Sequence, residues 1–114
     1  MPSEYLVPSD PHAQQVAETF KLLADPTRVK ILWVLHHGEH NVSELAELVG
    51  AAPTVVSQHL AKLRLAGLVT TRREATFAYY SATSEHVHDL VSEALSLAEH
   101  ATGDPTEDGH RYRH

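Results

Sequence analysis

Residues 42 to 69 read VSELAELVGAAPTVVSQHLAKLRLAGLV, and this stretch decides the fold. Leu45, Ala46 and Val49 form the apolar face of a first short helix that Gly50 ends. Pro53 suits the first position of a second helix, which closes at Gly67. Two short helices joined by a tight glycine-containing turn predict a helix-turn-helix, whose second helix enters the major groove of DNA.

The second helix has two distinct faces. Val56, Leu60 and Leu63 are expected to point inward. The outward positions hold small or polar side chains, namely Thr54, Ser57, Gln58, Ala61 and Lys62. Because these side chains fit a groove and most can hydrogen-bond, we expect Thr54, Ser57, Gln58 and Lys62 to contact DNA. His59 is expected to be structural or a phosphate contact.

A β-hairpin is predicted directly after the helix-turn-helix. Residues 68–73 and 76–82 contain β-branched and aromatic side chains separated by a few polar ones, with no glycine in the turn. Arg72 and Arg73 fall near its tip, where they can reach phosphate or the minor groove. The hairpin is therefore expected to contribute to the affinity for DNA more than to the choice of sequence.

The rest of the chain is mostly helical. Apolar residues at three- and four-residue steps predict helices over about 12–23, 26–37 and 84–99, and the second of these is apolar nearly all round and expected in the core. Residues 1–11 hold three prolines and are predicted to be a flexible arm, while 101–114 are rich in turn formers and charge and predict a flexible tail. The fold class is thus mainly α with a small β-hairpin, in one domain over residues 12–100.

Charge is unevenly distributed along the 114 residues. The formal net charge is −6, which by itself disfavours nucleic acid as a partner. Residues 53–80, however, hold four basic side chains against one acid and carry +3, between an N-terminal segment of −4 and a C-terminal one of −5. A clustered basic segment is typical of a phosphate-binding surface.

Several function classes are excluded or disfavoured by composition. The chain has no cysteine, which excludes disulfides and thiolate metal sites. It has no long apolar run and no basic start before an apolar stretch, so we expect a cytoplasmic protein with no membrane partner. No metalloprotease, phosphate-loop or nucleophile motif is present, so we expect no enzyme activity and assign no catalytic residue.

Three segments carry a resemblance to a known family. LADPTRVKIL (23–32), VSELAELVG (42–50) and VSQHLAKLRLAGLV (56–69) strongly resemble the ArsR/SmtB family of bacterial metal-sensing transcription regulators, within a match contiguous over residues 12–100. The resemblance implies a winged helix-turn-helix, with the hairpin as its wing, that forms a homodimer through the first and last helices. It also implies binding to double-stranded operator DNA, with an affinity that metal alters.

The last helix holds candidate metal ligands. One branch of the family has a four-ligand pattern that falls here on Ser84, His86, Leu97 and His100, so two positions hold a ligand and two do not. His86 and His100 are 14 residues apart, on one helix face and about 21 Å from each other, too far to share a metal within one chain. In an antiparallel helix pair, His86 of one subunit faces His100 of the other, which predicts two symmetric sites.

The stretch EHVHDLVSEALSLAEHA (85–101) and the histidine-containing tail also resemble the mycobacterial nickel and cobalt sensors of this family. That resemblance implies ligands at His86, Glu99 and His100, with His110 and His114 from the tail. Nitrogen and oxygen ligands without thiolate suit Ni²⁺, with Co²⁺ and Zn²⁺ as alternatives. Other hypotheses are a zinc sensor, a metal-independent winged-helix regulator and a partner-binding module. The operator sequence, the sign of the metal effect, and repression versus activation stay open.

Overall fold

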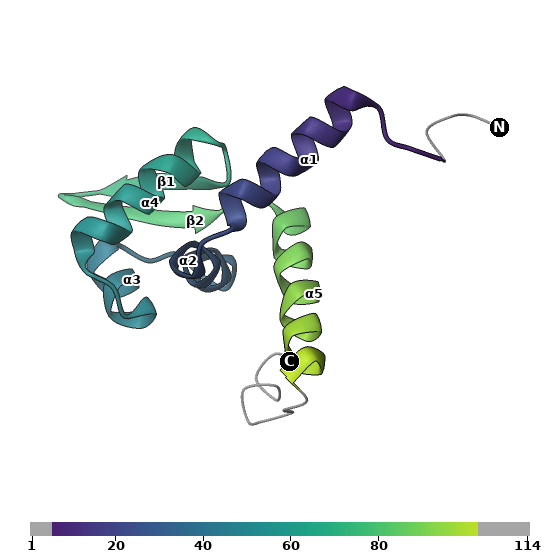
Figure 1. Cartoon of the computed structure of the whole chain (residues 1–114). Helices are drawn as coiled ribbons and strands as arrows, with labels where there is room; N and C mark the ends of the chain where they lie inside the picture. The colour runs from purple at the N-terminus through teal and green to yellow at the C-terminus, as the bar shows by residue number, and fades with distance from the viewer. Residues whose placement is uncertain (1–5, 103–114) are drawn as a thin grey trace.

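The structure is a computed structural model that describes residues 6–102. These residues form five helices and one antiparallel hairpin (Figure 1). The elements in order are α1 (Asp10–Leu23), α2 (Pro26–His36), α3 (Val42–Val49), α4 (Pro53–Leu65), β1 (Val69–Glu74), β2 (Phe77–Ala82) and α5 (Glu85–Thr102). The predicted fold class, mainly α with a winged helix-turn-helix, is confirmed.

Local capping fixes where the central helices begin. The Asp25 side chain accepts a hydrogen bond from the Arg28 backbone N–H at 3.1 Å, and Pro26 follows as the first residue of α2. At α3, Asn41 and Glu44 form the capping box that the sequence predicts, with hydrogen bonds of 2.9 and 3.0 Å. These caps fix the first residues of α2 and α3.

The outer helices are longer than the sequence indicated. α1 begins at Asp10, inside the segment expected to be an arm, because Ser9 caps it and Pro11 sits in its first turn, where a proline loses no hydrogen bond. α5 continues to Thr102, past the expected start of the tail at 101. Of the three prolines in the expected arm, Pro11 therefore belongs to the first turn of α1.

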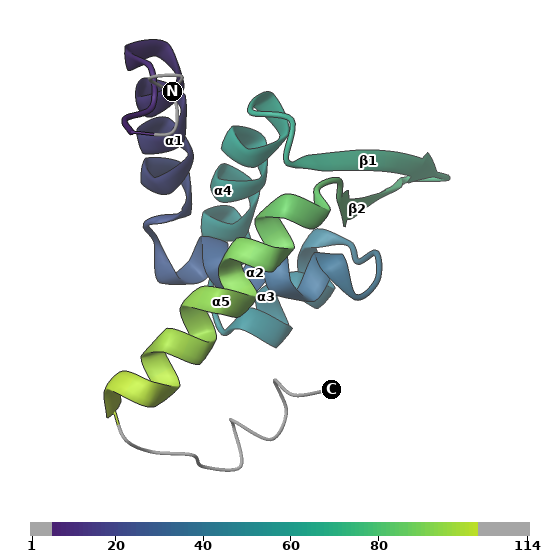
Figure 2. The same cartoon turned by 90° about the vertical axis from the view of Figure 1, so that its right-hand side faces the viewer.

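The core lies where α2, α3, α4, β1 and the start of α5 meet. Its fully buried large side chains are Ile31, Leu45, Val56, Leu60 and Leu63. The expectation that α2 lies in the core is confirmed, since three of its residues are buried. Figure 1 and Figure 2 show α1 and α5 projecting away from this compact part.

The hairpin forms without glycine in its turn. The strands pair from Val69 opposite Ala82 to Glu74 opposite Phe77. Ala75 takes the left-handed conformation with φ 55°, which closes the turn at some cost for a residue with a Cβ. A backbone bridge between His40 and Tyr80, with hydrogen bonds of 3.2 and 2.9 Å, ties the α2–α3 loop to β2. The wing is thus anchored at its side as well as at its base.

Candidate nucleic-acid interface and metal site

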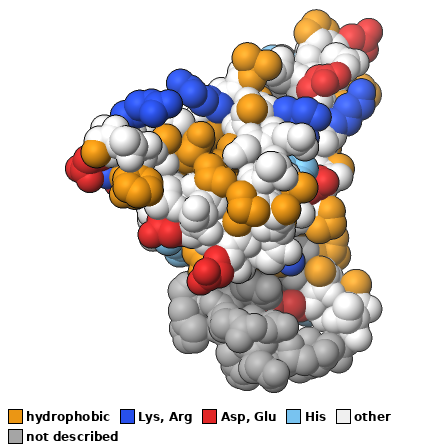
Figure 3. Space-filling view, turned by 90° about the vertical axis from the view of Figure 1, so that its left-hand side faces the viewer, with side chains coloured by type: hydrophobic (Ala, Val, Ile, Leu, Met, Phe, Trp, Pro, Cys, Tyr) orange, Lys and Arg blue, Asp and Glu red, His pale blue; other side chains and the backbone are white. Residues whose placement is uncertain are grey.

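The two faces of α4 are as the sequence predicts. Val56, Leu60 and Leu63 are buried against the core. The exposed residues of this helix include Thr54, Ser57, Gln58, Ala61 and Lys62. Because α3 packs against α4 and its inner residues are fixed in the core, the outer face is presented as one rigid surface. Figure 3 shows two groups of Lys and Arg side chains toward the top of the face that looks left in Figure 1.

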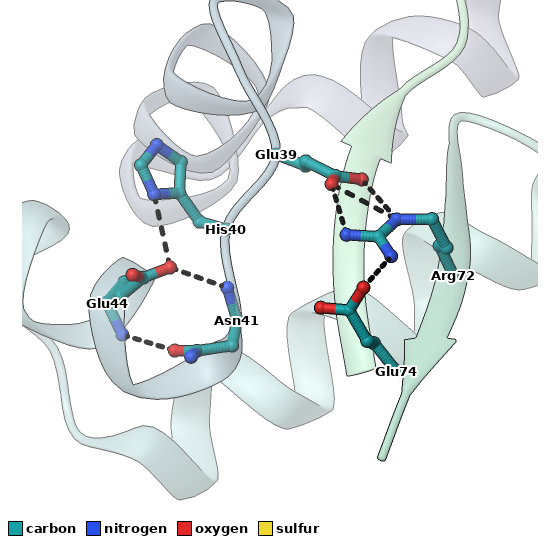
Figure 4. A network of polar contacts seen from close by, with 6 residues as sticks. All are labelled: Glu39, His40, Asn41, Glu44, Arg72 and Glu74. Atoms are coloured by element: carbon teal, nitrogen blue, oxygen red, sulfur yellow. Dashed lines mark hydrogen bonds and ion pairs between the residues drawn. The ribbon is translucent and has the colours of Figure 1, made fainter. Parts of the chain in front are cut away.

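The wing residue Arg72 is held by two carboxylates (Figure 4). Its Nη2 lies 2.6 Å from Glu39 Oε1, its Nε donates to the same carboxylate at 3.1 Å, and its Nη1 lies 3.2 Å from Glu74 Oε2. The guanidinium also lies 5.0 Å from the centroid of the Tyr79 ring. Hydrogen bonds from Arg72 hold the pKa of Glu39 below its ordinary value, and Glu39 in turn raises the pKa of Arg72. Arg72 therefore braces the wing against the α2–α3 loop.

Arg73 differs from its neighbour. It is exposed, pairs with Ala78 in the strand register, and makes no ion pair within residues 6–102. Both arginines lie near the tip, as predicted, but only Arg73 has its charge uncommitted. The acidic partner Glu39 was missed from the sequence, since it lies 33 residues from Arg72.

His59 joins α4 to the junction of α1 and α2. Arg28 Nε donates to His59 Nδ1 at 2.9 Å, and Arg28 Nη1 donates to the Leu22 carbonyl at 3.2 Å. On the other side of the ring, His59 Nε2 lies 3.7 Å from Asp25 Oδ1. Of the two roles expected for His59, the contacts support the structural one.

The candidate metal ligands of α5 lie at its two ends. His86 and His100 are exposed, and the side chain of Glu99 is half-buried. Glu99 Oε2 is shielded from solvent and has no hydrogen-bond partner among the described residues, which is an environment that favours a cation nearby. Helical geometry puts Glu99 about 100° around the helix from His100, so a shared ion needs ligands from more than one helix.

The tail ligands His110 and His114 lie outside the described residues. Within residues 6–102, no group of three or more His, Asp or Glu side chains is spaced to hold a metal ion.

A histidine cluster that the sequence did not predict lies between α2 and α5. The rings of His36 and His88 stack with centroids 3.5 Å apart and an interplanar angle of 7°. Trp33 lies 5.0 Å from His88 and 5.0 Å from His37, between centroids. Burial, followed by the nearby His36 and His37, lowers the pKa of His88. This cluster packs the C-terminal end of α2 against the first turns of α5.

α1 and α5 together expose an apolar surface. α1 buries none of its residues, and its Val16 and Phe20 are 52% and 54% exposed. On α5, Leu97 is 69% exposed and lies on the face between His86 and His100. A hollow of about 430 Å³ separates the two helices, lined by Phe20, Leu23, Ala24, Val29, Leu90, Val91, Ala94 and Leu95. Exposed apolar side chains gathered on one surface are typical of an interaction site, so this surface fits a subunit interface.

The sequence of this chain is similar to those of known bacterial regulatory proteins. The family described as bacterial regulatory protein, arsR family, matches residues 25–71. The HTH-type transcriptional regulator KmtR of Mycobacterium tuberculosis is 55% identical over 75% of this chain and 66% of its own length, slightly under two thirds. The cadmium resistance transcriptional regulatory protein CadC homolog of Staphylococcus aureus is 41% identical over 70% of this chain and 67% of its own.

A solved structure of a possible member of the same family has a similar fold. The homodimeric winged helix-turn-helix DNA-binding domain Mb0332 of Mycobacterium bovis, described as a possible ArsR-family transcriptional regulator, superposes with a TM-score of 0.69. It is 36% identical, and the match covers 86% of this chain and 94% of the other. Separately, every helix within residues 6–102 is too short or too polar to cross a bilayer.

Proposed function

The chain belongs to the ArsR family of bacterial regulatory proteins and is a DNA-binding winged helix-turn-helix transcription regulator, and from this premise we propose that nickel is the signal it reads. The working unit is a homodimer on operator DNA, joined through the exposed faces of α1 and α5. Metal bound at that interface changes the affinity for the operator. Cobalt and zinc are the alternative ions.

DNA reading rests on one observation, the exposed polar face of α4 above a fully buried inner face. Thr54, Ser57 and Gln58 lie in its N-terminal half, the part of a recognition helix that reaches base edges. Lys62 and the wing arginine Arg73 supply charge for phosphates.

Gln58→Ala tests direct base reading. We expect a loss of about 1–3 kcal/mol at one base position of each half-site, because a glutamine side chain can make paired hydrogen bonds to adenine. Binding to a set of single-base operator variants measures this. Gln15→Ala is the matched control, because Gln15 is exposed on α1 and its side chain makes no hydrogen bond within residues 6–102. An unchanged ranking of the variants in Gln58→Ala removes this residue from base readout.

The metal proposal is supported by ligand chemistry at the subunit interface. His86 and His100 lie on the same side of α5 as the exposed Leu97, so in the proposed dimer a second copy packed on this face can bring further ligands to them. Glu99 offers an unpartnered carboxylate oxygen, and His110 and His114 of the tail complete the proposed set. The absence of cysteine separates this ligand set from the thiolates that soft ions prefer, although one relative is named for cadmium.

In this mechanism the ion binds more tightly to one arrangement of the two subunits than to the other. The change in operator affinity that the ion causes can be no larger than this difference in its binding free energy. Isothermal titration of the dimer with nickel, cobalt and zinc measures the affinities. His86→Ala and His100→Ala should abolish tight nickel binding, whereas His37→Ala, outside α5, should retain it. Tight binding retained in both α5 variants makes the assigned site wrong, and a chain ending at Thr102 tests the tail.

A metal-independent regulator is the second candidate. It is favoured by the residues Ser84 and Leu97, which replace two ligands of the related four-ligand pattern. Anisotropy of an end-labelled operator duplex, titrated with each ion, separates the two. Nickel should shift the binding curve; if no ion shifts it, the effector is a partner or the protein acts without one.

A further inference from the structure

We propose that a hollow at the junction of α1, α2 and α4 holds a phosphate of the DNA backbone, through Lys21, Arg28 and Lys62. This extends the interface beyond α4 and the wing, and it rests on the proposed DNA-binding function. Lys21 and Arg28 were not among the DNA contacts expected from the sequence, because they belong to the N-terminal segment whose net charge is negative.

The hollow gathers positive charge from three helices. It has a volume of about 390 Å³ and is lined by Glu18, Lys21, Leu22, Arg28, Lys62 and Ala66. Three of these side chains are cations and one is an acid. Folding therefore brings Lys21 and Arg28, from an acidic stretch of sequence, beside a lysine of the basic stretch. Clustered cations beside a recognition helix are typical of phosphate contacts that position a protein on the duplex.

Arg28 is oriented in advance. Its Nε donates a hydrogen bond to His59 Nδ1 at 2.9 Å, and its Nη1 donates one to the Leu22 carbonyl at 3.2 Å. These bonds fix the plane of the guanidinium while Nη2 makes no hydrogen bond to the described residues. A planar guanidinium with a free edge suits a phosphate oxygen, and fixing it beforehand reduces the entropy cost of binding.

The nearby acids do not cancel this charge. Glu18 Oε2 lies 3.7 Å from Lys21 Nζ, and both side chains are largely exposed, so water screens the pair and a phosphate can compete for the lysine. Asp25 is engaged elsewhere, as the cap of α2 and beside His59.

The position of the hollow favours the backbone of the bound duplex as the source of phosphate. Lys62 lies one helical turn after Gln58 on the exposed face of α4. When the N-terminal half of α4 sits in the major groove, its C-terminal half and the flanking α1–α2 junction run toward the phosphates at the groove edge. A contact there is independent of base sequence and adds to the salt dependence of binding.

Lys21→Gln tests the site without disturbing the Arg28 hydrogen bonds. Binding of wild type and variant to a mixed-sequence duplex is measured over a range of salt concentration. Because each subunit then has one cation fewer at this phosphate, the magnitude of the negative slope of log K against log salt should fall, by at most about 0.9 per subunit, or about 1.8 for a dimer. The matched control is Lys30→Gln, an exposed lysine on α2 that does not line the hollow, and it should leave the slope unchanged.

A second measurement locates the contact. Methylphosphonate replaces single phosphates of an operator duplex selected by the wild-type chain. At one flanking position per half-site it should weaken wild-type binding more than Lys21→Gln binding, because only Arg28 and Lys62 still contact that phosphate in the variant. A wild-type slope in Lys21→Gln, or an equal fall in slope in both lysine variants, overturns the proposal. Failure of the wild-type chain to bind any duplex would instead overturn the DNA-binding function itself.

Discussion

Arg72 and Arg73 are neighbours on β1 with different surroundings. Successive side chains of a strand point to opposite faces, so one arginine reaches the α2–α3 loop and the other does not. Arg72 bonds both Glu39 and Glu74, and a DNA phosphate has to displace these carboxylates before it can use that charge. Arg73 has no such competitor among the described residues. We therefore assign phosphate contact to Arg73 and support of the wing to Arg72.

Replacing each arginine separately by glutamine tests this assignment. Arg73→Gln should lower the salt slope of DNA binding by about 0.9 per subunit, because the variant neutralises one phosphate fewer. Arg72→Gln should change the slope less, although it loosens the wing. Titrations of one duplex at several salt concentrations give both values. An equal fall in slope in the two variants contradicts the assignment.

The turn between α4 and β1 depends on one residue in the left-handed backbone conformation, Gly67. Gly67 ends the α4 region with φ 80°, a conformation that costs a residue with a Cβ about 1–2 kcal/mol. Gly67→Ala should therefore lower the free energy of unfolding by about that amount, measured by urea denaturation. Gly38→Ala is the control, because its added Cβ meets no atom within 4 Å and its φ is not positive. A similar destabilisation in both variants would point to chain flexibility and not to the left-handed conformation.

The ion pair between the wing and the α2–α3 loop gives a pH dependence. Since the pKa of Glu39 is lowered in the folded state, the carboxylate contributes stability above its ordinary value of 4.5, and this is lost as pH falls through the lowered pKa. The difference in unfolding free energy between wild type and Glu39→Gln should be full near neutral pH and shrink in acid. Glu47→Gln, exposed on α3 without an ion pair within residues 6–102, is the control. A difference that persists unchanged in strong acid makes the pair irrelevant to stability.

Local signals in the sequence predicted most elements correctly. The Asn41–Glu44 capping box and the Asp25–Pro26 start depend only on neighbours three or four residues away, and so they were readable. The hairpin turn was harder, because Ala75 adopts a conformation usual for glycine. The Arg72–Glu39 and Arg28–His59 contacts join residues 33 and 31 positions apart, and only the folded arrangement reveals them.

For the whole molecule, the exposed faces of α1 and α5 carry the proposed dimer interface. Phe20 and Leu97 are each more than half exposed, which a second copy would relieve. The sequence predicted these helices as the dimer interface only through family resemblance, because periodicity alone does not say which neighbour covers an apolar face. The assignment of His86, Glu99 and His100 as ligands stays a prediction for the same reason, since the proposed site needs ligands from a second subunit.

Leu97→Glu tests the interface. A dimer contains two copies of Leu97, and replacing each should remove about 1.5 kcal/mol of free energy gained from burying the side chain. The dimer dissociation constant should therefore rise roughly 100-fold or more. Leu65→Glu is the matched control, as Leu65 is 91% exposed and belongs to α4, which is outside the two helices of the proposed interface. Sedimentation velocity at several concentrations distinguishes monomer from dimer. If Leu97→Glu and the wild type dissociate over the same range of protein concentration, Leu97 is not part of the dimer interface.

The stacked histidines beside Trp33 provide a built-in optical reporter. Trp33 is the only tryptophan of the chain, and its ring lies between α2, which carries it, and His88 of α5. Indole emission is quenched by a neighbouring imidazolium and is sensitive to the polarity around the ring. Any movement of α5 relative to α2 that follows metal binding or subunit exchange should therefore change the intrinsic emission, without a dye or an added residue.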